Sequence, residues 1–130
     1  MPEGHATEEK RRKLADLLSS KFKFRNVPRA DIDTLVSCCS FMRFAKGSHI
    51  IMQDEEVKYL HFILSGSAEN YLMTTKANRK VLNTLYAGDD FSLPDLIMSV
   101  HVNPRSIAYS LCVDDCEIAI ITRDDFMKKC

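Results

Sequence analysis

The sequence lacks an excess of charge of either sign, because its 18 lysine and arginine residues balance 18 aspartate and glutamate residues. A protein that binds nucleic acid through phosphate contacts normally carries a basic excess, so this balance argues against that class. The basic run Lys10–Lys13 is expected to be the solvated face of a helix and not a binding patch.

Long apolar runs are also missing, and no stretch approaches the length that a membrane-spanning helix needs. The first residues are polar and no apolar segment follows them, so a secretory signal peptide is not expected. The five cysteines are an odd number without the spacing of a disulfide framework, which indicates free thiols in a reducing compartment. We therefore expect a cytoplasmic protein without membrane or nucleic-acid partners.

What the sequence does have is the composition of one globular domain, with 130 residues of which 45% are hydrophobic and 28% are charged. Residues 1–6 are expected to be disordered and residues 7–40 to be helical. Thr7 is suited to cap a first helix, and Pro28 to begin a second. Apolar residues recur at helical spacing in two stripes, which are Leu14, Leu17, Leu18 and Phe22, then Ile32, Leu35, Val36 and Cys39.

From residue 41 to residue 122 the apolar period changes to two, which predicts a mainly β domain. The expected strands are 41–44, 49–52, 59–64, 68–73, 80–86, 107–113 and 116–122, with a hairpin loop at 74–79. A short helix is expected at 93–100, and residues 123–130 begin a C-terminal helix that the end of the chain truncates. Short strands at regular spacing indicate a sandwich or barrel behind a helical pair.

The segment 88–108 joins the end of a strand, a short helix and an arginine, Arg105, at the start of the next strand. A helix N-terminus offers unpaired N–H groups and a positive dipole end. An arginine facing it adds a planar bidentate donor suited to phosphate. Together they would hold one anionic phosphate, although on spacing alone an ordinary surface or ion-pair role for Arg105 is the stronger interpretation.

Neither a metal site nor a catalytic centre is expected. His49, His61 and His101 form no His-x-His pair and have no acid at ligand spacing, so they are expected to be surface or satisfied core groups. Cys112 and Cys116 lie on different expected strands and would need two further ligands to bind zinc. No nucleophile has a convincing base partner, so we do not expect an enzyme.

Glycines stand where strands should turn, at positions 47, 66 and 88. They belong to the first three of four notable stretches, which are 41–47, 59–68, 88–91 and 104–106, the last leading to 115–118 and 123–126. In this order they resemble the cyclic nucleotide-binding domain family. The resemblance implies a β-roll, similar to a double-stranded jelly roll, with two N-terminal helices, a short cassette helix and the start of a C-terminal helix.

The resemblance also implies a phosphate-binding cassette within 88–108. The family's arginine pairs with the cyclic phosphate and matches Arg105, and Ser106 takes the small position after it, where its N–H or hydroxyl reaches the phosphate. The family's Gly-Glu is replaced by Ser92-Leu93, so the acid that binds the ribose is missing. In another register Asp95 stands in its place; otherwise Asp95 caps or flanks the short helix. The candidate ligand-binding residues are Arg105, Ser106, Asp95, Ser92, Leu93 and Ala108.

By this resemblance the domain is a regulatory sensor for cAMP, cGMP or a related phosphate-bearing ligand, with no other cofactor. It would signal by conformational change to an attached effector or protein partner. The alternative is a degenerate roll kept as a protein-interaction module, which Leu93 and the apolar run 96–98 would suit. The regulatory domain of a transcription factor is a third option, but no DNA-binding helices follow. Since the chain stops at Cys130, either it is a fragment or the lid helices are absent.

Overall fold

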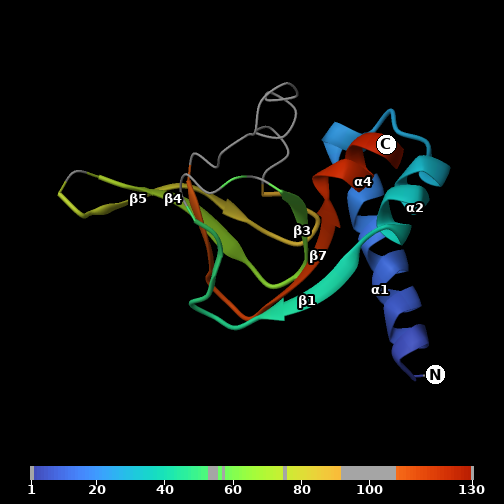
Figure 1. Cartoon of the computed structure of the whole chain (residues 1–130), viewed down its shortest axis with the longest axis horizontal. Coiled ribbons are helices and arrows are strands. Elements are labelled where there is room, and N and C mark those ends of the chain that lie inside the picture. Colours follow the sequence, from blue (N-terminus) through green and yellow to red (C-terminus); the bar gives the residue numbers. More distant parts are fainter. Residues whose placement is uncertain (1, 53–55, 57, 75, 92–107, 130) are drawn as a thin grey trace.

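The computed structural model describes residues 2–52, 56, 58–74, 76–91 and 108–129, and Figure 1 shows its helices gathered at one end of a β structure. In this part of the chain the strands are β1 (Ser40–Phe44), β2 (His49–Ile51), β3 (Tyr59–Ser65), β4 (Ala68–Met73), β5 (Arg79–Leu85), β6 (Tyr109–Cys112) and β7 (Cys116–Thr122). The helices are α1 (Pro2–Ser19), the 3-10 turn η1 (Phe22–Phe24), α2 (Arg29–Ser37) and α4 (Arg123–Lys129).

The strands form two antiparallel sheets, which together make the roll. One sheet has the order β1-β7-β3, and the other has the order β2-β6-β4-β5. In the first, Phe62 lies opposite Ala119; in the second, Ala68 lies opposite Cys112. Consecutive strands of the chain alternate between the sheets from β1 to β4, then β4, β5 and β6 share one sheet and β7 returns to the other. The β4–β5 hairpin reaches away from the helices (Figure 1).

Period-two alternation along β3 divides the core into two. Leu60, Phe62 and Leu64 face α1 and α2, with apolar residues of β7 beside them. Ile63, between them, faces the other way and packs inside the roll against residues that include Phe91. The mainly β fold expected from the sequence is thus confirmed, with one core between helices and sheet and a second within the roll.

Two features of the N-terminal segment differ from expectation. The first helix begins at Pro2, whereas the sequence predicts that it begins at Thr7, after residues 1–6. Proline fits the first helical turn because its missing N–H needs no partner there. Phe22 was placed on the buried stripe, yet it is 76% exposed because α1 ends at Ser19 and η1 turns its side chain outward. The Arg25 guanidinium lies over its ring at 3.8 Å.

Candidate functional site

The chain enters the cassette segment 88–108 alongside β3. The Gly88 N–H donates to the Ile63 carbonyl at 2.7 Å, and the Ile63 N–H donates to the Asp89 carbonyl at 2.9 Å. The Phe91 N–H then donates to the His61 carbonyl at 3.1 Å. These bonds attach residues 88–91 to the edge of the β1-β7-β3 sheet. Phe91 therefore packs in the core within the roll, which we call the inner core.

Residues at and just after the end of α1 pack against the start of segment 88–108 on the outside of the roll. Gly88 has a φ of +90°, and a Cβ there would lie 2.7 Å from Cε of Lys21 and 3.4 Å from Cβ of Leu17. The Lys21 ammonium forms an ion pair with the Asp89 carboxylate at 3.0 Å. The left-handed backbone favours glycine here, while the Lys21 side chain is flexible enough to move away from a Cβ. The cassette entry is therefore in direct contact with the end of α1 and with Lys21 just after it.

The chain leaves the cassette segment in the opposite sheet. Ala108 is buried and leads directly into β6, where alternation places Ala108, Ser110 and Cys112 on one side. Because Cys112 belongs to the inner core, that side faces into the roll. There the Ser110 hydroxyl donates to Oδ1 of Asn70 at 2.6 Å. The exit thus places a hydrogen-bonded polar pair inside the roll, among mainly apolar residues.

His61 is a third polar group inside the roll, beside the entry. Its side chain shares the inner side of β3 with Ile63, is 9% exposed, and meets the Phe91 ring edge-on with the centroids 6.0 Å apart. Burial lowers the pKa of its imidazole to about 4, because the charged form loses its hydration. Among the described residues, its buried Nδ1 atom has no hydrogen-bond partner. The interior therefore holds a neutral imidazole with an open hydrogen-bonding position.

Most of the sequence-predicted site lies outside the described residues. This applies to the short helix 93–100 and to Ser92, Leu93, Asp95, Arg105 and Ser106, whose roles stay predictions. Of the six candidate residues the structure places Ala108, at the buried exit.

The inner polar residues His61, Asn70 and Ser110 were missed as site residues. A signal for them existed in the sequence, since each lies two residues from an apolar core position: Ile63, Ala68 and Cys112.

The histidines, and the cysteines Cys112 and Cys116, lie in different environments. His61 was expected to be a surface or a satisfied core group; it is a core group, and among the described residues its Nδ1 has no hydrogen-bond partner. His49 is exposed and hydrogen-bonds the Tyr71 hydroxyl, as a surface group would; His101 lies outside the described residues. Burial raises the pKa of the Cys112 thiol to about 12 and also raises that of Cys116. Within the described ranges, no three His, Cys, Asp or Glu side chains gather as metal ligands would.

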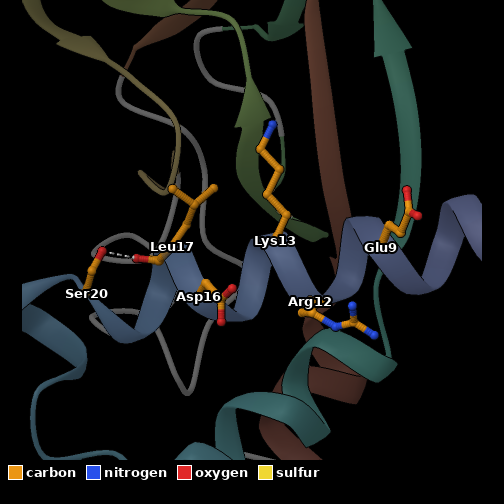
Figure 2. A pocket seen from close by; sticks show the side chains of 6 residues that line it. All are labelled: Glu9, Arg12, Lys13, Asp16, Leu17 and Ser20. Atoms are coloured by element: carbon orange, nitrogen blue, oxygen red, sulfur yellow. Dashed lines mark hydrogen bonds between the residues drawn. The ribbon is translucent and has the colours of Figure 1, made fainter.

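The basic run Lys10–Lys13 lies on α1. Figure 2 shows part of it in a shallow pocket along the helix, which is lined by Glu9, Arg12, Lys13, Asp16, Leu17 and Ser20. The two acids and two bases of the pocket balance each other, and Lys10 forms an ion pair with Glu117 at 2.6 Å. The pocket therefore has no charge excess that would select an anion. Among the helices in the described part of the chain, none has the length and apolar character to cross a bilayer.

The chain is similar to proteins of known fold over most of its length. A family model described as "Cyclic nucleotide-binding domain" matches residues 41–130. The regulatory domain of Toxoplasma gondii PKA with cAMP shares 18% identity and a TM-score of 0.80, with 95% of this chain and 46% of that chain covered. The sensor domain of the transcriptional regulator DNR from Pseudomonas aeruginosa shares 18% identity at a TM-score of 0.76, covering 92% and 77%.

A third structure is the regulatory subunit of a cAMP-independent protein kinase A from Trypanosoma cruzi, bound to guanosine. It shares 18% identity at a TM-score of 0.77, with 94% of this chain and 42% of that chain covered. The chain thus spans less than half of both kinase subunits. A comparison with curated protein sequences gave no match. The structural likeness establishes the β-roll architecture.

Proposed function

Because the chain belongs to the cyclic nucleotide-binding domain family, we propose that it is a regulatory sensor domain that binds a cyclic nucleotide or a related phosphate-bearing ligand. The fold is typical of regulatory sensors. The observation that carries the proposal is the placement of the two ends of segment 88–108. Phe91 and Ala108 are both buried, one in each sheet, so the intervening chain starts and ends at the interior of the roll.

In this proposal Arg105 and Ser106 bind the phosphate, as the cassette of the family implies. Asp95, or the backbone near Ser92 and Leu93, takes the sugar. In the sequence, Arg105 comes three residues before the buried Ala108. The polar pair of Asn70 and Ser110 supports a ligand that carries hydrogen-bonding groups, because an empty apolar roll would gain nothing from them.

Two structural relatives support a nucleotide or nucleoside as the ligand class. The Toxoplasma gondii domain was solved with cAMP, and the Trypanosoma cruzi subunit, described as cAMP-independent, with guanosine. The missing Gly-Glu distinguishes two outcomes for this chain. If the contact of Arg105 with the phosphate supplies most of the binding free energy, cyclic nucleotides bind. If contacts with the sugar and base supply most of it, a nucleoside binds as well.

The proposed role is one of binding and not of catalysis, in keeping with a family that is generally non-enzymatic. Ligand capture would move segment 88–108, and the Lys21–Asp89 ion pair would pass that movement to α1. The recipient would be an attached effector domain or a protein partner. We place the protein in the cytoplasm, where cyclic nucleotides and free thiols coexist.

Calorimetric titration with cAMP, cGMP and guanosine tests this proposal. We expect a cyclic nucleotide to bind and Arg105→Ala to weaken it by roughly 10- to 150-fold, since a hydrogen bond to a charged group contributes about 1.5–3 kcal/mol. The same change should leave guanosine, which lacks a phosphate, unaffected. Arg43→Ala is the matched control, because that arginine is exposed on β1. Absence of heat at millimolar cyclic nucleotide, or affinity unchanged by Arg105→Ala, would contradict the sensor role.

A further inference from the structure

Strand β5 leaves an unusual amount of apolar surface uncovered for a strand of a small domain. Every residue of β5 except Leu85 is exposed. Val81 and Leu82 are 47% and 43% exposed, and Met73, at the end of the partner strand, is 42% exposed. Figure 1 shows this hairpin at the end of the molecule opposite the helices. We call Met73, Arg79, Lys80, Val81 and Leu82 the β5 edge surface.

The β5 strand is also the edge of its sheet. The sheet has the order β2-β6-β4-β5, and within the described residues β5 pairs with β4 alone. An edge strand presents a row of backbone N–H and C=O groups that another strand is able to pair with. Natural proteins blunt such an edge by shortness, by charged side chains, by bulges or by covering it, and β5 carries Arg79, Lys80 and one register shift in its pairing with β4. This edge runs for seven residues, from Arg79 to Leu85.

The sheet beneath the β5 edge surface is held in place by ring contacts. The Arg79 guanidinium lies over the Tyr71 ring at 4.2 Å, and Tyr71 stacks on Tyr109 with their centroids 5.1 Å apart. The register pairs Tyr71 with Val81 and Met73 with Arg79, so these side chains share one face. The exposed apolar groups are therefore presented by a preorganised face, which lowers the entropy lost when a partner binds.

The charge of the hairpin indicates what kind of partner fits. Between residues 68 and 86, in the described part, the cations are Lys76, Arg79 and Lys80, and the acid is Glu69. Glu69 lies 3.5 Å from Arg79 and offsets that charge. Lys76 and Lys80 remain as a positive excess beside the apolar side chains. A second copy of this chain would bring like charges together, whereas an acidic segment would be attracted.

We propose that the β5 edge surface binds an extended acidic segment of a partner protein, which adds to β5 as a further strand. Main-chain hydrogen bonds to the β5 edge supply the affinity, and alternate apolar side chains of the segment contact Val81, with Met73 one strand further in on the same face. Carboxylates on the segment face Lys76 and Lys80. A lipid surface fits less well, because it offers no groups to pair with the backbone of an edge strand. The site is independent of the cassette and of any nucleotide.

Amide NMR titration of the whole domain with a short peptide that alternates glutamate and valine tests the proposal. We expect shifts concentrated on residues 79–85 and on Met73, fading as salt is raised. A peptide with lysine in place of glutamate should bind more weakly, and one with proline at alternate positions should not bind, since proline cannot donate to the ladder. Equal binding of all three peptides, or no shift along β5 at millimolar peptide, would overturn the proposal.

Two protein variants and one membrane control sharpen the result. Lys80→Glu should weaken the acidic peptide by about fivefold, the size expected of one exposed ion pair. Arg12→Glu, an equal reversal at an exposed position of α1, should leave the affinity unchanged. Val81→Thr keeps a β-branched side chain while removing apolar contact, and should also weaken binding. Stronger association with phosphatidylserine vesicles than with the peptide would assign the surface to membranes and overturn the proposal.

Discussion

Replacing Gly66 with alanine is expected to destabilise the fold by about 3 kcal/mol, which lowers the melting temperature by about 10 °C. Gly66 has a φ of +91°, a conformation that costs any residue with a Cβ. A Cβ there would lie 2.4 Å from the Asp115 carbonyl and 2.9 Å from the Cys116 sulfur. The first of these contacts is with a backbone atom, so the clash is relieved only if the turn at Gly66 or the turn at Asp115 moves.

The reason for this large effect is that two turns lock the sheets together at this point. The Ser67 carbonyl, next to Gly66, accepts from the Val113 N–H at 3.0 Å, and the Ser67 hydroxyl donates to the Asp114 carboxylate at 2.6 Å. The first turn joins β3 to β4 and the second joins β6 to β7, so each turn spans both sheets. Displacing one turn therefore disturbs the whole roll.

Gly47→Ala is the matched control for this prediction. Gly47 also has a positive φ, +88°, but a Cβ there meets nothing within 4 Å. Only the backbone strain should remain, which costs about 1 kcal/mol. Thermal unfolding followed by circular dichroism compares the two variants. Equal losses at Gly47 and Gly66 would show that the contact with Asp115 contributes nothing.

The second large effect is a loss of stability on acidification that depends on one residue, His61. Its folded pKa, about 4, lies below the 6.5 of a free imidazole, so the unfolded chain takes up a proton first as the pH falls. The contribution of His61 to stability is complete above pH 6.5, declines between pH 6.5 and 4, and is lost below. The difference corresponds to about 3 kcal/mol in the free energy of unfolding.

Urea unfolding at a series of pH values measures this contribution. His61→Phe keeps a buried ring and should flatten the decline between pH 6.5 and 4. His49→Gln, which changes an exposed histidine on β2, should leave the decline in place. A wild-type profile that does not fall in this range, or a fall that survives in His61→Phe, would contradict the burial of a neutral imidazole inside the roll.

The sequence predicted the strands well because short apolar stretches are separated by glycine and polar turn residues. The expected strand 68–73 matches β4, and 116–122 matches β7. The hairpin loop predicted at 74–79 is one residue too long, because Arg79 already belongs to β5 and pairs with Met73; polar residues without an apolar period indicated the turn between the two strands. These elements are decided by local pattern, and the structure agrees with it.

The sequence predicted less well wherever a result depends on contacts between distant residues. Phe22 continues the apolar spacing of α1, but the helix ends before it and the side chain turns to Arg25. The open Nδ1 of His61 depends on Phe91 and on the inner face of the roll, which no local pattern contains. The cassette residue Arg105 lies outside the described part and rests on the family resemblance.

The most direct measurement of the central claim is an amide NMR titration of the domain with cAMP and cGMP. If the roll binds a nucleotide through segment 88–108, shifts should concentrate on the described residues at its two ends, Gly88–Phe91 and Ala108–Ser110. They should be lost in Arg105→Ala. Shifts confined to other parts of the chain, or no shifts at millimolar nucleotide, would contradict the account.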